Sequence, residues 1–340
     1  MRAGVFRGAG LLTVEEVPDP VAGPRDVLVE VAACGVCGSD VHVWNAGRDE
    51  WAGQVMGHEF AGTVLEVGAE VDGIRTGDRL TGLPIQPCGE CDRCRAGLTH
   101  LCAVWTTRSI AFGLPGAFAE RLRIPDARLG YNVHRLPGGV TVEDGALVEP
   151  LAVAVHAVRR AGAVTGRSAL VLGLGPIGLH AGQALRAGGA DPVFGVDRSA
   201  TRRAVAASLG LVALDDATAA GQVDVVVEAS GAPALVEQAM TATRPGGTVV
   251  LVALYHRPAT FDAMGAVQRE ITVRGSANVT PQDFTDAIAL LADGRAAAAP
   301  LISHRYPLAE IQQAFHTQAD QSGSVKVLVT DRKPDTSGQP

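Results

Sequence analysis

Lysine is almost absent from this chain, and so is any concentration of positive charge. Of the 29 basic residues only Lys326 and Lys333 are lysines, the formal net charge is −7, and the arginines form no basic run. Nucleic acids and anionic membrane surfaces select proteins with concentrated positive charge. We therefore expect neither nucleic acid nor membrane as a partner.

Long apolar runs are missing as well. No stretch approaches the ~20 consecutive apolar residues of a transmembrane helix. The N-terminal sequence MRAGVFRGAGLLTVEEV is interrupted by Arg and Gly and then turns acidic, so it lacks the apolar segment of a secretory signal. We expect a cytoplasmic protein, because cysteines stay reduced in that compartment and remain available to metal.

The length of 340 residues and the apolar content of 47 % predict two globular domains. The first third contains short Val- and Leu-rich segments punctuated by Gly and Pro, which indicates β structure. From Ser168 onward strand and helix patterns alternate, and continuous apolar runs are typical of buried parallel strands. The predicted layout is a β-rich domain over 1–148, an α/β domain over 149–278, a return to the first domain over 279–330, and a mobile polar tail over 331–340.

Four of the six cysteines lie close together in the segment PCGECDRCRAGLTHLC, at Cys88, Cys91, Cys94 and Cys102. Pro and Gly within the segment allow the tight turns that would bring four thiolates to one tetrahedral zinc ion. Two disulfides or four unrelated thiols are the alternatives. The local spacing and the expected reducing compartment favour zinc. We predict a structural zinc lobe over about 86–104.

A second metal centre is predicted from residues that are distant in sequence but belong to the same β-rich domain. Cys37 lies in CGVCGSDVH, and His58 and Glu59 lie in MGHEF. A thiolate, an imidazole and a carboxylate with one open position are the composition of a catalytic zinc site. Glu149, in LVEPL, is a second candidate carboxylate. Cys34 is predicted to be a small buried residue rather than half of a redox pair.

The sequence GLGPIG joins a strand pattern to a helix pattern and contains Gly173, Gly175 and Gly178. The first glycine permits a tight turn, the second lets a pyrophosphate approach the backbone, and the third lets helix and strand pack closely. The free amides at the helix N-terminus would bind the phosphates. The spacing therefore predicts a dinucleotide site.

Asp197 closes the next strand pattern, where a carboxylate can accept both ribose hydroxyls and repels a 2′-phosphate. The aspartate favours NAD over NADP. Arg198 and Arg202 follow it closely, which leaves some tolerance of NADP open.

With these motifs the chain, from about residue 1 to 330, resembles the zinc-dependent medium-chain dehydrogenases of the alcohol dehydrogenase superfamily. The resemblance is strongest to their polyol (sorbitol-like) and threonine dehydrogenase branch. It rests on CGSDVH, GHE, the four-cysteine lobe, VEP, GLGPIG, the distal Asp and the terminal KVLVT. It implies a GroES-like β-barrel catalytic domain with an inserted Rossmann domain, a doubly wound parallel sheet, and a cleft between them for cofactor and catalytic zinc.

The resemblance also implies roles for single residues. Cys37 and His58 would be catalytic zinc ligands, with Glu59 and Glu149 sharing the remaining role. The four clustered cysteines would hold a structural zinc, giving two zinc ions per chain. Ser39 and His42 stand at the offsets that relatives use for proton relay. The residues predicted to bind NAD are Gly173, Gly175, Pro176, Ile177, Gly178, Asp197, Arg198, Arg202 and Ala253.

The predicted activity is zinc-dependent hydride transfer between NAD and a polar secondary alcohol, such as a polyol, sugar, cyclitol or amino alcohol, to give the ketone. Trp44 and Trp51 are candidates for the substrate wall, although tryptophan more often packs in a core. An amino alcohol dehydrogenase of the L-threonine type is the main alternative. A non-catalytic NAD-binding redox sensor on the same fold is a weaker one. Relatives form homodimers or homotetramers, and strand 248–254 is predicted to lie at the sheet edge.

Short-chain dehydrogenases are excluded by the tyrosines. That class requires a Tyr followed four residues later by Lys, and neither Tyr131, Tyr255 nor Tyr306 has one.

Overall fold

The computed structural model describes residues 1–47, 49–320 and 322–330, and the chain divides into two compact units. Unit 1 comprises Met1–Glu149 and the chain from Ile302 onward, and unit 2 comprises Pro150–Leu301. The mobile tail predicted over 331–340 lies outside the described residues.

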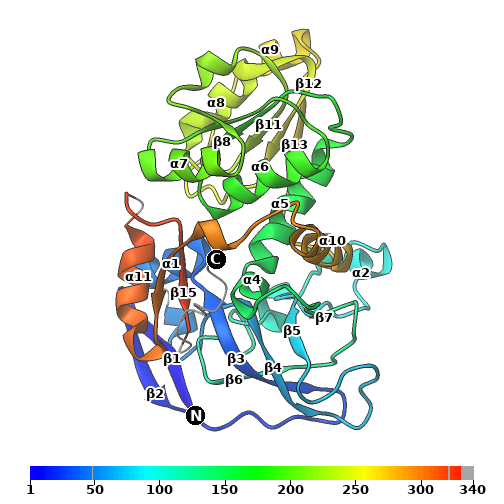
Figure 1. Ribbon diagram of the computed structural model, residues 1–340, viewed down its shortest axis with the longest axis vertical. Coiled ribbons are helices and arrows are strands. Elements are labelled where there is room, and N and C mark those ends of the chain that lie inside the picture. Colours follow the sequence, from blue (N-terminus) through cyan, green and yellow to red (C-terminus); the bar gives the residue numbers. More distant parts are fainter. Residues whose placement is uncertain (48, 321, 331–340) are drawn as a thin grey trace. The chain divides into compact units, whose positions relative to one another are not determined.

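Unit 1 is built on a mostly antiparallel seven-stranded sheet, in which the strands occur in the order β14-β15-β3-β4-β5-β7 and β6 also pairs with β3 (Figure 1). A hairpin of β1 and β2 accompanies it. Phe6, Phe60, Phe118 and Phe315 are fully buried in its core. The strands are β1 (Arg2–Gly8), β2 (Leu11–Glu16), β3 (Val27–Gly35), β4 (Glu59–Val67), β5 (Arg79–Gly82), β6 (Arg121–Ile124), β7 (Val133–Arg135), β14 (Ile302–Tyr306) and β15 (Lys326–Val329).

The last strand of unit 1 brings the far end of the chain next to its beginning. β15 pairs antiparallel with β3, with Leu328 opposite Gly35 and Val329 opposite Cys34. The first residue of β15 therefore reaches the segment that follows β3. The helices of this unit are short: α1 (Gly38–Ala46), η1 (Asp49–Trp51), α2 (Asp92–Arg95), η2 (Thr99–Leu101), α3 (Trp105–Arg108), α4 (Val142–Ala146), η5 (Leu308–Glu310) and α11 (Ile311–Ala319).

Unit 2 contains the predicted parallel sheet, with strand order β10-β9-β8-β11-β12-β13. The order reverses between β8 and β11, which is the point where such sheets bind ligands at their carboxyl edge. The strands are β8 (Ala169–Leu172), β9 (Val193–Val196), β10 (Val212–Leu214), β11 (Val223–Glu228), β12 (Thr243–Leu251) and β13 (Thr272–Gly275). The helices are α5 (Val148–Ala161, which begins in unit 1), α6 (Pro176–Ala187), α7 (Ala200–Ser208), η3 (Ala217–Ala220), α8 (Pro233–Ala242), α9 (Ala263–Gln268), α10 (Pro281–Ala292) and η4 (Ala299–Leu301). The predicted α/β class is confirmed.

Two expectations differ from the structure. The α/β domain was predicted to end at residue 278, whereas unit 2 runs through Leu301 and includes α10. The reason is a polar anchor between helices: Asp283, at the start of α10, accepts a hydrogen bond from His156 Nδ1 (2.9 Å) and pairs with Arg159, both on α5. The strand predicted at the sheet edge is wrong too, because β12 pairs on both sides and β13 lies outside it.

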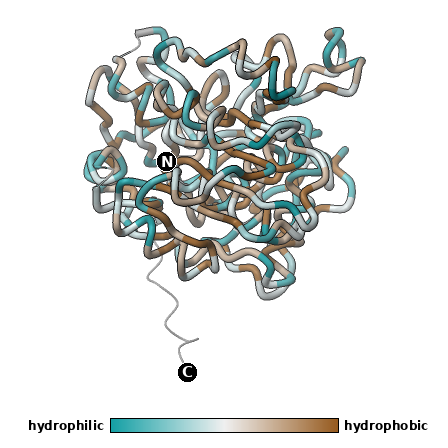
Figure 2. Tube along the Cα trace, turned by 90° about the horizontal axis from the view of Figure 1, so that it is seen from above, coloured by the Kyte–Doolittle hydropathy of each residue, from teal (hydrophilic) through white to brown (hydrophobic). Residues whose placement is uncertain are grey.

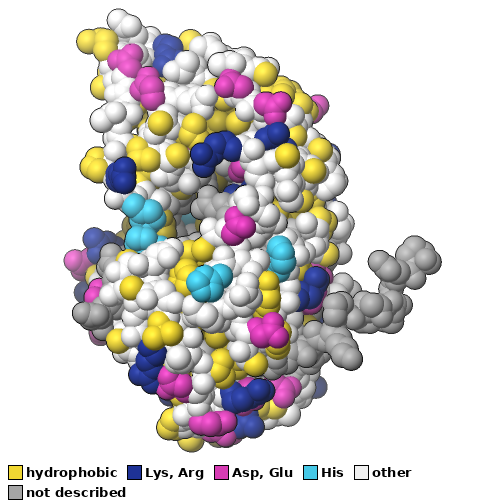
Figure 3. All heavy atoms as spheres, turned by 90° about the vertical axis from the view of Figure 1, so that its left-hand side faces the viewer, with side chains coloured by type: hydrophobic (Ala, Val, Ile, Leu, Met, Phe, Trp, Pro, Cys, Tyr) yellow, Lys and Arg dark blue, Asp and Glu magenta, His cyan; other side chains and the backbone are white. Residues whose placement is uncertain are grey.

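Hydrophobic stretches alternate with hydrophilic ones along the trace, and several loops that project from it are hydrophilic (Figure 2). On the face drawn in Figure 3, acidic and basic side chains are interspersed. None of the helices in the described chain combines the length and apolar character needed to cross a bilayer.

Candidate active site and metal centres

The four clustered cysteines form a thiol cluster on unit 1. Their sulfur atoms all lie within 4.8 Å of one another, and all six cysteines of the chain are free thiols. Backbone amides donate hydrogen bonds to the sulfurs. Ala103 N and Cys94 N, for example, each donate to Cys91 Sγ at 3.5 Å. These two contacts lower the pKa of the Cys91 thiol to about 6. Burial instead raises the pKa of the Cys94 thiol to about 12. Four free cysteine sulfurs at this spacing fit a tetrahedral zinc ion rather than disulfides, and a bound zinc would favour the thiolate form of all four.

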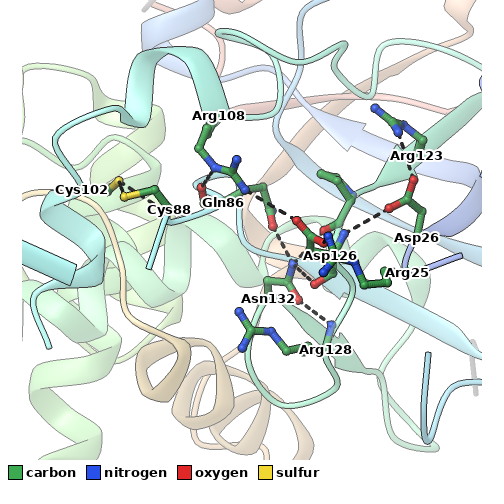
Figure 4. A network of polar contacts seen from close by, with 11 residues as sticks. Arg25, Asp26, Gln86, Cys88, Cys102, Arg108, Arg123, Asp126, Arg128 and Asn132 are labelled. Carbon is green, nitrogen blue, oxygen red and sulfur yellow. Dashed lines mark hydrogen bonds and ion pairs between the residues drawn. The ribbon is translucent and has the colours of Figure 1, made fainter. Parts of the chain in front are cut away.

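A polar network ties the base of this lobe to the barrel (Figure 4). Gln86 and Arg108 exchange hydrogen bonds across the neck of the lobe: Gln86 N donates to Arg108 O at 3.0 Å, and Arg108 Nε donates to Gln86 O at 2.9 Å. The buried Gln86 Oε1 accepts from Asn132 Nδ2 at 2.6 Å. Asn132 in turn accepts from Arg128 N at 2.7 Å. The lobe is therefore closed at its neck and fastened to one place on the barrel.

Cys37, His58 and Glu59 are brought together as predicted, with one possible ligand atom from each within 4.8 Å of the others. Cys37 caps the N-terminus of α1, and Glu59 opens β4 directly after His58. Gly35 is required beside them, since a Cβ there would lie 2.1 Å from Glu59 Oε2. A thiolate, an imidazole and a carboxylate that converge in this way fit a catalytic zinc ion.

Asp40 belongs to this site, although the sequence analysis did not single it out. Its side chain is fully buried; Oδ2 accepts from Cys37 N at 3.0 Å, and Oδ1 lies 3.5 Å from His58 Nδ1. Burial lowers the pKa of His58, but the charges of Asp40 and Cys37 outweigh it and hold that pKa well above the ordinary value. Because Asp40 lies on the Nδ1 side of the ring, Nε2 is the nitrogen that would remain for a metal. The sequence does contain a signal for Asp40, because it stands three residues after Cys37, the spacing at which a carboxylate accepts a hydrogen bond from the backbone of an N-cap residue.

Lys326 is the second residue that was missed. It is 2 % exposed, and its Nζ donates to Glu59 Oε1 at 2.8 Å, to Glu59 Oε2 at 2.7 Å and to Val36 O at 3.1 Å. Burial lowers the pKa of Lys326, but the charges of Glu59 and Cys37 raise it by a larger amount. The pKa therefore lies above its ordinary value. The site thus contains its own buried cation, supplied by β15.

Glu149 is buried close to the same cluster. Burial raises its pKa to about 7, His58 acts in the opposite direction, and Glu59 adds to the rise. A carboxyl group in such surroundings gains from a neighbouring metal cation, which would favour its ionised form. Ser39 and His42 lie on α1 directly after Cys37 and are half-buried.

The aromatic residues near the site divide into two groups. Trp44 is 4 % exposed, and its ring meets Phe315 edge-on with centroids 5.9 Å apart, which is a core contact. Trp51 instead contacts Phe112 at 5.0 Å, and Phe112 contacts the His58 ring at 5.3 Å. Phe112 was not among the predicted site residues. Its position depends on Ala111, whose φ of 76° lies in the left-handed region that no sequence pattern announces.

The predicted dinucleotide turn has the expected geometry. Gly173 has φ of 89°, and a Cβ at Gly178 would lie 1.8 Å from Gly173 O. At Gly175 a Cβ would meet nothing nearer than Arg202 Nη1 at 3.9 Å, so that side of the turn is open. Pro176 and Ile177 begin α6, whose N-terminal amides face the same turn.

Asp197 is fixed beside this turn. Its Oδ2 accepts from Leu174 N and its Oδ1 from Ser199 N, both at 2.8 Å. Arg202 Nη1 lies 3.8 Å from Asp197 Oδ2, and Arg198 is exposed. Ala253 follows β12 at the same carboxyl edge of the sheet. The residues present fit a dinucleotide.

Comparison with known proteins gives consistent relatives. Residues 23–137 match the alcohol dehydrogenase GroES-like domain, and residues 176–293 match the zinc-binding dehydrogenase domain. Sorbitol dehydrogenase of Gallus gallus is 35 % identical, covering 98 % of both chains. L-threonine 3-dehydrogenase of Bacillus velezensis is 33 % identical, covering 89 % of this chain and 91 % of the relative.

Among solved structures, a zinc-binding dehydrogenase from Sinorhizobium meliloti 1021 bound to NADP has a TM-score of 0.88 and 33 % identity, covering 97 % of this chain and 98 % of that one. Both domains and these relatives point to the same assignment. The chain belongs to the zinc-dependent medium-chain dehydrogenases, in their polyol and threonine dehydrogenase branch, and is a dehydrogenase of alcohols.

Proposed function

We propose that the protein oxidises a polar secondary alcohol (a polyol, sugar, cyclitol or amino alcohol) to the ketone with NAD as hydride acceptor. The observation that carries the proposal is the convergence of Cys37, His58 and Glu59 within 4.8 Å, with buried Glu149 close by. That donor set suits a metal with an open position for a hydroxyl group. The polyol and amino alcohol relatives support a hydroxylated substrate.

In the proposed mechanism, Cys37 and His58 would hold zinc, and Glu59 and Glu149 would share the remaining ligand role. Zinc bound there would act as a Lewis acid that lowers the pKa of the substrate hydroxyl. The Asp40 carboxylate, 3.5 Å from His58 Nδ1, orients the ring through its charge, and Lys326 balances the negative charge of Glu59. Ser39 and His42, on the first turns of α1, pass the released proton towards solvent.

For the substrate wall, Trp51 is the stronger of the two predicted tryptophans. Its contact with Phe112, and that of Phe112 with His58, extends an aromatic surface from the metal ligands. Aromatic faces can pack against the C–H faces of a carbohydrate while its hydroxyls bind polar groups. We assign Trp44 a smaller part, since its ring packs against Phe315.

NAD is the proposed cofactor because Asp197 is a fixed carboxylate directly after β9, where this class of fold would bind the adenosine ribose. A 2′-phosphate would be repelled there. The relative from S. meliloti is bound to NADP, and Arg202 lies close to Asp197, so the preference requires a direct test. Asp197→Ala should lower the ratio of kcat/KM for NAD over NADP at least tenfold, because it removes a charged acceptor. Asp191→Ala, in the turn before β9, is the control.

The activity is tested by following NADH absorbance with a panel of polyols, sugars, cyclitols and L-threonine, together with zinc analysis. Two zinc ions per chain and turnover of a hydroxylated substrate support the proposal. Turnover of L-threonine alone would favour the amino alcohol alternative. Oxidation of simple aliphatic alcohols only would contradict the substrate class, and one zinc with NAD binding but no turnover would favour the sensor.

We further propose a homodimer or homotetramer assembled through the outer strand of unit 2. β13 is exposed along its length, and Val273 on it, like Met264 and Val267 on α9, exposes an apolar side chain. Open strand edges with apolar neighbours are pairing sites. Sedimentation of Val273→Lys should give a smaller species than the unaltered protein. The free thiols favour a cytoplasmic location.

A further inference from the structure

Glu228, the last residue of β11, is a fully buried carboxylate, and the structure gives it no ion pair among the residues it describes. Its Oε1 accepts from Ser230 N at 2.9 Å and from the Ser230 hydroxyl, and its Oε2 accepts from the Tyr255 hydroxyl. A buried charge is costly unless hydrogen bonds compensate it. Tyr255 therefore supplies a bond that Glu228 needs, and it comes from a different loop.

Tyr255 lies in the segment that follows β12. This segment leaves the sheet beside β11, since Val252 N donates to Glu228 O at 3.0 Å. The two loops also lie close together, because a Cβ added at Gly231, whose φ is 72°, would lie 2.7 Å from Leu254 O. The loop after β11 and the loop after β12 therefore lie side by side, and the hydrogen bond from the Tyr255 hydroxyl to Glu228 joins them.

The same loops reach the glycine-rich turn. A Cβ at Gly173 would lie 2.8 Å from Ser230 Cα. Ser230 is the residue that donates twice to Glu228, and its hydroxyl also accepts from Ala232 N at 3.0 Å. The turns after β8, β11 and β12 thus form one contact chain at the carboxyl edge of the sheet, where the strand order reverses.

We propose that the hydrogen bond from Tyr255 to Glu228 is a clasp that positions segment 252–257, with Ala253, against the nicotinamide half of the dinucleotide. This inference rests on the proposed NAD site. Asp197, which follows β9, lies on the adenosine side of the reversal. The loops after β11 and β12 lie on the other side, which is the side of the second nucleotide. Tyr255 and Glu228 act as positioning residues, because they touch the loops and not the reacting atoms.

The hydrogen bond from Tyr255 to Glu228 persists at neutral pH. Burial raises the pKa of Tyr255, and the hydrogen bond to Glu228 and its charge raise it further. The hydroxyl therefore remains a donor, and a bond to a charged acceptor is about twice as strong as a neutral one.

The test compares two probes with Tyr255→Phe: NADH, which spans both halves of the site, and ADP-ribose, which lacks nicotinamide. Loss of the clasp should raise the Kd for NADH about tenfold, the effect of one hydrogen bond to a charged group. The Kd for ADP-ribose should change less than about twofold, because that probe does not reach the nicotinamide side of the site. Amide exchange in 252–257 should be faster in the variant without ligand.

Tyr131→Phe is the matched control, because it removes a phenolic hydroxyl from unit 1, where the ring lies 4.5 Å from the Arg128 guanidinium carbon. Glu228→Gln completes a double-mutant cycle, in which its effect on NADH binding should shrink once Tyr255 is Phe. Unchanged NADH affinity in Tyr255→Phe would overturn the clasp. Equal weakening of both probes would overturn its assignment to the nicotinamide half. Failure of the unaltered protein to bind either probe would overturn the NAD site itself.

Discussion

Lys326 Nζ lies 2.7 Å and 2.8 Å from the two carboxylate oxygens of Glu59, and both side chains are almost completely buried. The pair joins the first residue of β15 to the first residue of β4. It places a fixed positive charge beside a site that also contains the Cys37 thiol, the His58 imidazole and the carboxyl groups of Glu59 and Asp40. The charge balance of the metal centre therefore depends on a strand from the other end of the chain.

Replacing Lys326 by Met should leave Glu59 buried without its partner and reduce the free energy of unfolding by about 3–5 kcal/mol. Urea unfolding measures the loss. Arg305→Met is the control, since Arg305 and Glu143 form an ion pair with partly exposed side chains, and such pairs contribute at most about 1 kcal/mol. Equal losses in the two variants would show that burial of the Glu59 pair has no special effect.

Asp40→Asn should weaken zinc binding at the catalytic site about 10- to 100-fold, because the group that orients His58 loses its charge. Competition with a chelator measures the affinity. Asp144→Asn is a matched control: Asp144 also stands third in its helix and accepts from the N-cap residue, with Thr141 N at 3.1 Å, but no imidazole faces it. If both variants kept the same zinc affinity, the orienting role of Asp40 would be refuted.

Cys94→Ser and Cys37→Ser should each lower the zinc content but differ in consequence. Cys94→Ser opens the lobe cluster and should lower the melting temperature, because a structural zinc contributes directly to folding. Cys37→Ser should keep the fold and abolish turnover. Circular dichroism melts and zinc analysis on both variants distinguish these effects, and a similar loss of folding in the two would contradict the separation.

Asp283 should make unit 2 sensitive to acid. Burial raises the pKa of this carboxyl, but hydrogen bonds from His156 and Thr280 outweigh it and hold the pKa below the ordinary 3.8. A depressed folded pKa contributes stability that is present above 3.8 and is lost as the pH falls through the lower value. Asp283→Asn should therefore lower stability at pH 6 and flatten its decline below pH 4. Asp286→Asn, with a partly exposed side chain on the same helix, should retain the decline.

Local motifs explain how much of the site could be predicted. The four cysteines, the GHE segment and the glycine-rich turn each lie within a few residues, so spacing alone indicated their chemistry. Lys326 could not be found in this way, because its partner Glu59 is 267 residues away and only strand pairing joins them. Tyr255 and Phe112 were missed for related reasons. The role of Tyr255 depends on contact between two loops, and the position of Phe112 depends on the left-handed backbone angle of Ala111.

The extent of unit 2 was mispredicted for a similar reason. Helix pattern alone does not reveal which domain a helix packs against, and α10 is assigned by the side-chain contacts of Asp283 with α5. The edge of the sheet depended on β13, whose short sequence TVRG carries a weak strand signal beside the long apolar run of β12.

The pairing of β15 with β3 has a consequence for synthesis on the ribosome. Cys37, His58 and Glu59 emerge early, whereas the cation that neutralises Glu59 emerges only after the whole of unit 2 has been translated. The buried pair of Glu59 and Lys326 can therefore form only after β15 has been made, and the pairing of β3 with β15 is a late step of folding during synthesis.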